Sequence, residues 1–313
     1  MNVEVFAEWL RRQGHMVKRT ASSYWHNQGP RILQAFPYHW LIEPEHGEIN
    51  ELLRRERCIG VRYSTPVSAA VGKISYHVAL LQLNYSLEFL PKKARHDVRK
   101  AAKTAIPEPI SFARLASEGW QLRNETLQRQ GRVGAEIPAW WSNLCLSADG
   151  LPGFETWGAL VEGTLVASLL AFTCDNCCSI LYQQSRTAYL SQGMNNLLTF
   201  AFTENVVQRH GIELIFYGLN SLDAPSSVDE FKFRMGYVAK PVRQRIVFHP
   251  WLSPLFNPAS HAALRQLRCW QPKNPTLAKT EGMLRFYLEG KRPLHQQSWP
   301  EALVKPAATN AEA

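Results

Sequence analysis

The chain has 313 residues, of which 45% are hydrophobic and 19% are charged, a balance typical of a globular protein with one large domain or two. Its formal net charge of +9 favours a polyanionic partner, such as a nucleotide cofactor, a phosphorylated carrier, RNA or an anionic membrane. No apolar run is long enough to span a bilayer, and acids and arginines interrupt the N-terminal apolar stretch. We therefore expect a cytoplasmic protein without a transmembrane segment and with free thiols.

The first ninety residues predict short strands at 31–42, 58–65 and 73–90, with a helix at 47–57 between the first two. They also hold a group of aromatic side chains with a histidine. Such groups often line sugar or acyl pockets, and they also pack small cores, so both interpretations stay open. The candidate substrate-binding residues here are Tyr24, Trp25, His39 and Trp40.

Residues 91–105 predict a basic amphipathic helix that follows Pro91 and ends before Pro107. One face carries alanine and valine, and the rest carries basic side chains. Arg95 and Arg99 share a face, which is either a solvated surface or a contact for substrate phosphates. Beyond it we expect a strand at 110–115, helices at 118–130 and 138–147, and a three-stranded meander over 157–185.

Cys174, Cys177 and Cys178 invite a zinc interpretation, but a structural zinc site needs four ligands and no second cysteine pair follows. Asp175 and Asn176 are typical turn residues. We therefore expect a hairpin turn with buried thiols, and no metal.

The next elements are a helix at 193–211, a strand at 212–220, a helix at 227–235 and a final strand at 238–250. The polar residues Tyr182 to Ser185 end one strand, and Asn220 follows another. Ligands bind at the carboxyl ends of parallel strands where a sheet opens, so Tyr182, Gln184 and Asn220 are candidate catalytic residues. An ordinary polar strand end and a turn asparagine are the alternatives.

Lys232 stands between two phenylalanines, at the edge of the buried face of its helix. A lysine there either runs its methylenes along the core with no further role, or places a charge beside the strand ends. In the second case it is a candidate catalytic residue, able to stabilise an oxyanion.

Three stretches, 91–103, 193–218 and 229–237 ("DEFKFRMGY"), together with the element order over 109–250, resemble the GNAT superfamily of N-acyltransferases and its Fem-type branch. The resemblance implies an α/β fold with a mixed central sheet and helices on both faces. It also implies two lobes: a shortened N-terminal lobe at 1–90 and an acyltransferase domain at 91–250. Residues 251–313 would form a helical extension with a disordered tail.

The resemblance also implies ligand contacts. Phosphates of the donor would meet Arg186, Ser191, Gly193 and Asn195 at the start of the central helix. Lys232 would lie at the substrate, with Tyr217 beside it. The expected reaction is transfer of an acyl or aminoacyl group, from acyl-CoA or an aminoacyl carrier, to an amine. That amine would belong to a small molecule, such as a cell-envelope or polysaccharide precursor, and nucleic acid would enter only as aminoacyl-tRNA.

The stretch 184–196 contains one glycine, Gly193, where the superfamily has a glycine-rich phosphate loop. This difference favours an alternative: a non-catalytic GNAT-like module that binds a nucleotide-linked carrier, nucleic acid or a partner protein through its basic surface.

Overall fold

The structure is a computed structural model that describes residues 2–29, 31–82, 84–132, 134, 136–222, 227–272 and 274–304, without the side chains of residues 227 and 228. Residues 305–313, most of the predicted disordered tail, lie outside this range. The strands are β1 (Val17–Arg19), β2 (Tyr24–Gly29), β3 (Ile32–Phe36), β4 (Gly60–Thr65), β5 (Lys73–Leu80), β6 (Ile106–Pro109), β7 (Phe154–Val161), β8 (Thr164–Cys174), β9 (Cys177–Ser185), β10 (Leu214–Leu219) and β11 (Val238–Phe248). The helices are α1 (Val3–Arg12), α2 (His46–Arg55), α3 (Lys92–Ala101), α4 (Phe112–Arg129), α5 (Pro138–Leu146), α6 (Met194–Val207), α7 (Ser227–Arg234), α8 (Pro258–Trp270), α9 (Pro275–Gly290) and α10 (Glu301–Val304). Short 3-10 turns are η1 (Thr187–Gln192), η2 (Ser253–Leu255) and η3 (Leu294–Gln296).

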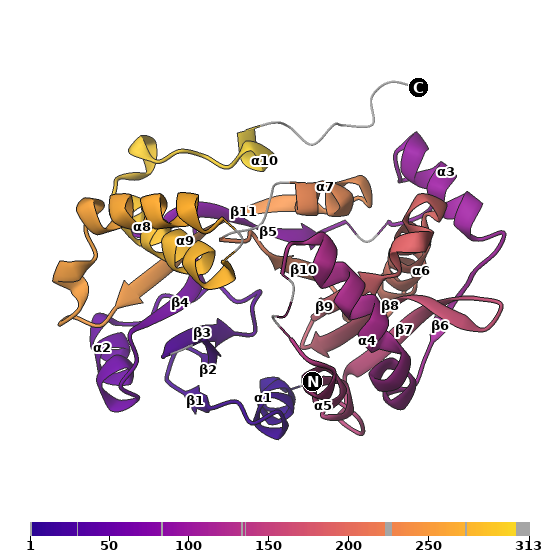
Figure 1. Cartoon of the computed structure of the whole chain (residues 1–313), viewed down its shortest axis with the longest axis horizontal. Coiled ribbons are helices and arrows are strands. Elements are labelled where there is room, and N and C mark those ends of the chain that lie inside the picture. Colours follow the sequence, from indigo (N-terminus) through magenta and orange to yellow (C-terminus); the bar gives the residue numbers. More distant parts are fainter. Residues whose placement is uncertain are drawn as a thin grey trace.

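These strands form an 11-stranded mixed sheet in the order β1-β2-β3-β4-β11-β5-β10-β9-β8-β7-β6 (Figure 1). The strand β5, from the first ninety residues, lies between β10 and β11 and pairs antiparallel with both. Both parts of the chain therefore share one sheet. The division into lobes at residue 90 remains a prediction.

Helices cover both faces of the sheet, as predicted (Figure 1). On one face α3 and α6 enclose a large core with β5 and β7 to β10, and α2 encloses a smaller core with β3 and β4. On the other face α1, α4 and α5 pack together at one end, and α9 packs on β11 at the other. None of the described helices is both long and apolar enough to cross a membrane.

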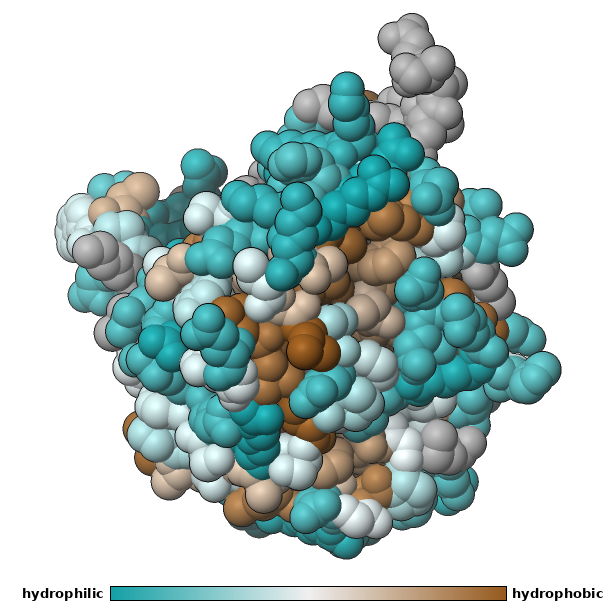
Figure 2. All heavy atoms as spheres, turned by 90° about the vertical axis from the view of Figure 1, so that its right-hand side faces the viewer, coloured by the Kyte–Doolittle hydropathy of each residue, from teal (hydrophilic) through white to brown (hydrophobic). Residues whose placement is uncertain are grey.

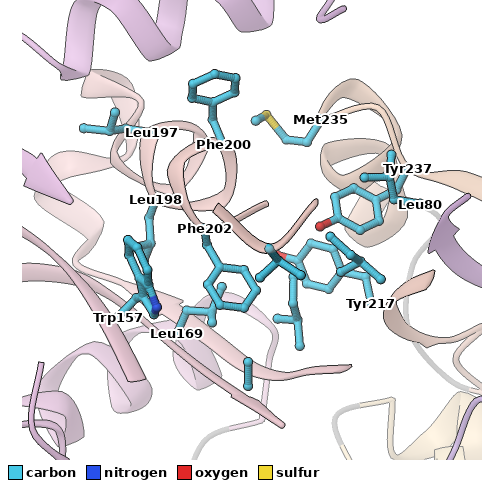
Figure 3. Close-up of a cluster of buried hydrophobic side chains, with 14 of the residues drawn as sticks. Leu80, Trp157, Leu169, Leu197, Leu198, Phe200, Phe202, Tyr217, Met235 and Tyr237 are labelled. Carbon is cyan, nitrogen blue, oxygen red and sulfur yellow. The ribbon is translucent and has the colours of Figure 1, made fainter. Parts of the chain in front are cut away.

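The large core is built around α6 (Figure 3). Leu197, Leu198 and Phe202 are 4% exposed or less. Near them the rings of Tyr217 and Tyr237 meet edge to face, with centroids 5.0 Å apart. The core thus reaches the point where β10 ends, and it fixes the position of Tyr217.

The expected meander over 157–185 is confirmed as β7, β8 and β9. At the β8–β9 turn, Cys174 pairs with Cys177 and Asp175 takes a positive φ of 52°. The thiols of Cys174, Cys177 and Cys178 are buried, so the hairpin interpretation is confirmed.

The strand predicted at 110–115 is wrong. Residues 106–109 form β6 instead, and Ser111 caps α4 by accepting a hydrogen bond from the amide of Arg114 at 3.1 Å. A serine cap competes with strand pairing because its side chain satisfies an unpaired helix amide. The sequence analysis also missed α1, whose buried face includes Phe6, Trp9 and Leu10.

Candidate functional site

The sheet opens between β9 and β10. These strands are parallel neighbours, as predicted, but they pair only where Cys177–Ser179 meets Leu214–Phe216. Beyond that point β9 stays with β8, and β10 continues along β5. A bulge between Phe216 and Gly218 leaves Tyr217 as the extra residue in β10. Bulges redirect side chains, and this one lies where the two strands separate.

A hydrogen-bonded network lies in the opening. The hydroxyl of Tyr217 donates to the amide oxygen of Gln183 on β9. The amide nitrogen of Gln183 donates to the hydroxyl of Thr199 on α6 at 2.9 Å. Burial raises the pKa of Tyr217, so its hydroxyl keeps its proton and remains a donor.

The network continues to the start of α6. The Nδ2 of Asn195 donates to the hydroxyl of Ser185 at 2.9 Å, and Gln183 approaches the Oδ1 of Asn195 at 3.4 Å. Thr199 and Asn195 lie one helical turn apart, so both face the same strand. The end of β9 and the first turn of α6 therefore share one polar surface.

Lys232 reaches the other side of Tyr217. Its ammonium lies 5.0 Å from the centre of the Tyr217 ring and 2.8 Å from a carboxylate oxygen of Asp229. The lysine side chain is 15% exposed. Gly218, with a φ of +133°, lies next to the ammonium, since a Cβ there would be in van der Waals contact with the lysine nitrogen at 3.7 Å. A cation is thus held at the carboxyl end of β10.

A cavity of about 280 Å³ adjoins this network. It lies between α3, the η1–α6 turn, the end of β9 and α7. Ser185 and Asn195 connect it to the network, and Lys93 and Arg234 place positive charge at its wall. Its lining consists of Lys93, Ala94, Asp97, Ser185, Tyr189, Leu190, Asn195, Asn196, Phe231 and Arg234.

The proposed phosphate contacts fall into two groups. Asn195 lines the cavity, and Gly193 immediately precedes the first residue of α6. Arg186 instead forms an ion pair with Glu125 at 2.8 Å. The carbonyl of Ser191 accepts a hydrogen bond from Lys100 at 3.0 Å. Lys93 and Arg234, which the sequence analysis did not select, are the cationic residues that line the cavity.

Tyr182 and Gln184, the two residues of β9 that were predicted to be catalytic, lie outside the network in the opening. Tyr182 faces α4 and α5, with its ring 5.0 Å from the guanidinium of Arg123, and burial raises its pKa to about 12. Gln184 is 1% exposed and donates to the hydroxyl of Ser168 at 2.9 Å. The network in the opening uses Gln183 instead.

The remaining predicted residues do not line the cavity. Asn220 contributes backbone, since its amide donates to the carbonyl of Tyr76 at 3.0 Å. Tyr24 and Trp25 are buried in two hydrophobic cores, and Trp25 is 0% exposed. His39 lies on the opposite side of the sheet, with its ring 6.2 Å from that of Phe216.

Three further predicted residues, Trp40, Arg95 and Arg99, are not part of the cavity lining. Trp40 lies beside Tyr24 and Asp175 in a separate, shallow hollow. Arg95 is half-buried and Arg99 exposed on α3. Within the described part of the chain, no three His, Cys, Asp or Glu side chains form a group that could hold a metal ion.

The α3 side of the molecule carries mostly hydrophilic side chains. Figure 2 shows this face, with hydrophilic surface across its upper part and a strip of hydrophobic surface below. Lys92, Lys93, Arg99 and Lys100 are exposed on α3. A basic ridge therefore borders the cavity.

These features define a class of fold: a GNAT/Fem-like sheet in which two parallel strands separate beside the first turn of a central helix. No family model and no curated protein sequence matches the chain. Among solved structures, FemX is similar, with a TM-score of 0.54 and 10% identity over 80% of this chain and 92% of FemX.

Two other solved structures are similar to the chain. The C-terminal domain of an Agrobacterium fabrum protein described as a lysylphosphatidylglycerol synthetase has a TM-score of 0.51 and 12% identity, over 77% of this chain and 87% of the domain. A Bacteroides thetaiotaomicron protein of unknown function has a TM-score of 0.52 and 10% identity over 77% of this chain and 87% of its own. At these identities the similarity shows the fold alone.

Proposed function

We propose that the protein is an N-acyltransferase that moves an acyl or aminoacyl group from an activated donor to an amine. The observation that carries this proposal is the hydrogen-bonded network that runs from the cavity, through Asn195 and Gln183, to Tyr217 beside Lys232. One similar structure is described as a lysylphosphatidylglycerol synthetase, and its product carries an aminoacyl group. The fold and that name support transfer of an acyl or aminoacyl group, and the amine acceptor is our proposal.

The reaction requires little covalent chemistry from the side chains of the protein. The amine attacks the donor carbonyl, a C–N bond forms, the bond to the carrier breaks, and the amine proton passes to the leaving group or to water. Charge develops on the carbonyl oxygen, so a fixed cation or N–H donor nearby lowers the barrier. Lys232 is proposed to supply that charge. Gln183 and Tyr217 would orient the donor in the opening.

Lys93, Arg234 and the first turn of α6 are proposed to bind the phosphate-bearing part of the donor. A helix N-terminus and cationic side chains together favour anions. The exposed basic residues of α3 would extend this contact to further phosphates. The donor would then be an acyl-CoA or an aminoacyl-tRNA, and the acceptor a small molecule with an amine, such as a cell-envelope precursor.

One pair of observations supports the non-catalytic alternative. Arg186 is already paired with Glu125, and a Cβ at Gly193 would lie 2.7 Å from the carbonyl oxygen of Asp97, so α3 packs closely against the start of α6. Such a site offers fewer phosphate contacts than a glycine-rich loop. A module of this kind would bind an anionic carrier through its basic surface without transferring a group.

The test is a binding and transfer experiment with the full-length protein. Thermal shifts are measured with coenzyme A, a panel of acyl-CoAs, nucleotide sugars and aminoacyl-tRNA, and each donor that binds is offered a mixture of amines, with products followed by mass spectrometry. We expect binding that the double variant Lys93→Met/Arg234→Met weakens tenfold or more. The matched control is Lys18→Met, since Lys18 pairs with Glu56 outside the cavity.

The salt dependence of binding affinity distinguishes an acyl-CoA donor from an aminoacyl-tRNA donor. Each phosphate contact contributes about 0.7–0.9 to the slope of log affinity against log salt, so tRNA would give a much steeper slope than coenzyme A. Binding without transfer to any amine would support the non-catalytic module. No binding of any donor would overturn the proposal.

A further inference from the structure

The ammonium of Lys232 is held by a buried carboxylate with a second partner. Asp229 is 7% exposed. One of its oxygens lies 2.8 Å from the ammonium of Lys232, and the other accepts a hydrogen bond from the hydroxyl of Tyr76 at 2.9 Å. The carboxylate is therefore fixed from two sides.

The two partners of Asp229 come from distant parts of the chain. Lys232 follows it by one turn of α7, whereas Tyr76 lies in β5, 153 residues away in sequence. This contact ties the helix that carries the lysine to the strand that the first ninety residues insert into the sheet. The geometry of Lys232 thus depends on both parts of the chain.

Electrostatics require such a partner. The ammonium faces the ring of Tyr217 at 5.0 Å, and little of the lysine side chain meets water. Removing a cation from water favours its neutral form unless an opposite charge compensates. Among the described residues, the titratable groups that contact Lys232 or its partner Asp229 include Tyr76 on β5 and Tyr217 on β10, and both tyrosines are neutral near pH 7 because burial raises their pKa. In the described part of the chain, Asp229 is then the carboxylate that pairs with Lys232.

We infer that Asp229 is a positioning residue, which, held by Tyr76, keeps Lys232 charged and directed at the opening between β9 and β10. This inference rests on the proposed function, since it assigns Lys232 the role of a fixed cation. It contrasts with a purely structural role, in which Asp229 only attaches α7 to β5. The two roles predict different effects on the charge of Lys232 when Asp229 is substituted.

The experiment measures the reactivity of Lys232 toward acetic anhydride as a function of pH, by mass spectrometry of the peptide that contains it. Only the neutral amine reacts, so reactivity at a given pH reports the neutral fraction. In Asp229→Asn, which keeps a hydrogen-bond acceptor for Tyr76 but removes the charge, we expect Lys232 to react at least fivefold faster at pH 7. Tyr76→Phe leaves both charges in place and should give a smaller increase, because the carboxylate becomes mobile.

A matched control separates charge from general loosening. Lys18 pairs with Glu56 at 3.0 Å on another part of the molecule. Glu56→Gln should change the reactivity of Lys18 and leave that of Lys232 unaltered. Thermal melting and near-UV circular dichroism establish that each variant is folded, and Tyr76→Phe carries the test if Asp229→Asn does not fold.

The outcomes separate this inference from the proposed function. If folded Asp229→Asn, or in its place Tyr76→Phe, shows the pH profile of the wild type at Lys232, the positioning role is overturned, whether or not a donor binds. If the profile shifts as expected but no donor binds the wild type, the electrostatic role stands and the acyltransferase proposal fails. If both hold, Asp229→Asn should also move the pH profile of transfer, which a purely structural role would not do.

Discussion

At the scale of single residues, two neighbouring glutamines on one strand have different surroundings. Gln183 points to α6 and joins Tyr217 to Thr199, whereas Gln184 points to the other face and bonds Ser168. Side chains alternate along a strand, so adjacent polar residues rarely share a site. A substitution of Gln184 is therefore a control for the same substitution of Gln183.

We expect Gln183→Leu to weaken donor binding or transfer by about tenfold or more, since a buried hydrogen-bond network would lose its central member at a cost of about 1–3 kcal/mol. Gln184→Leu should leave binding within about twofold and change only the free energy of unfolding. Thermal shift with a donor that binds the wild type measures both. Equal effects of the two changes would contradict the assignment of Gln183 to the site.

Lys232→Met tests the cation itself. The change keeps the aliphatic stem but leaves the buried carboxylate of Asp229 without its counter-ion, so the free energy of unfolding should fall by about 3–5 kcal/mol. If Lys232 stabilises the oxyanion, turnover should drop about a hundredfold or more, the scale of one lost oxyanion donor. Chemical denaturation and the transfer assay measure the two effects. Unchanged turnover would leave Lys232 with a structural role only.

At the scale of elements, the start of α6 is constrained by its packing against α3. Gly193 has a φ of +76°, and an added Cβ would meet the carbonyl of Asp97 at 2.7 Å. Gly211, after the same helix, has a φ of +80° with nothing within 4 Å. The two glycines share a left-handed backbone conformation that would strain an alanine, and they differ in the space around them.

Gly193→Ala should therefore destabilise the protein by about 2–4 kcal/mol, because strain and a backbone clash add, whereas Gly211→Ala should cost about 1 kcal/mol. Chemical denaturation measures both free energies of unfolding. Donor binding should also weaken in Gly193→Ala if the first turn of α6 holds phosphate. Similar losses at both positions would mean that α3 moves aside without cost.

Much of the fold was predictable from sequence because several of its helices and strands have strong local sequence signals. The β7–β9 meander follows from its turns at 162–163 and 175–176, and α8 follows from its proline start, since both signals are local. The position of β5 was not predictable. Its insertion between β10 and β11 is set by contacts 130 residues or more away in sequence, and no local pattern encodes them.

The site was predictable in part. Lys232 could be selected because it departs from the polarity expected at its helix position. Asp229, one turn earlier, carried a weaker signal, since an acidic residue in a first helical turn is common. Tyr76 and Thr199 carried none, because both acquire their role only through tertiary contacts. Tyr24 and Trp25 were selected as aromatic ligand contacts, and they lie in cores because burying large rings stabilises a small group of strands.

At the scale of the whole molecule, three histidines in the first ninety residues lie on or beside the shared sheet, with His26 and His77 buried and His39 half-buried. Burial lowers the pKa of His26 to about 3, of His77 to about 3 and of His39 to about 4. The charge of Lys240 adds to the effect of burial at His77, whereas the carboxylate of Asp175 opposes it at His39. These side chains are therefore neutral in the folded protein near pH 7.

Stability should fall with acid well before the carboxylates titrate. The unfolded chain takes up protons at these histidines below about pH 6.5, and the folded chain does not until about pH 4. Between these values, proton binding therefore stabilises the unfolded state and lowers the free energy of unfolding. From pH 7.5 to 5.5, each histidine should cost about 1.4 kcal/mol of the free energy of unfolding, or about 4 kcal/mol for the three.

Urea denaturation at several pH values measures this loss. His77→Asn removes one titrating group and should flatten the pH dependence by about 1.4 kcal/mol over that range, even though the loss of its contact with Ser64 lowers stability at pH 7.5. His295→Gln, at an exposed position near the C-terminal helices, is the matched control and should leave the pH dependence unchanged. If His77→Asn kept the full slope, His77 would take up its proton at the same pH in the folded and the unfolded chain. Its ring would then need an acidic partner that the described residues around it, Ser64, Phe216, His39, Lys240 and Arg62, do not supply.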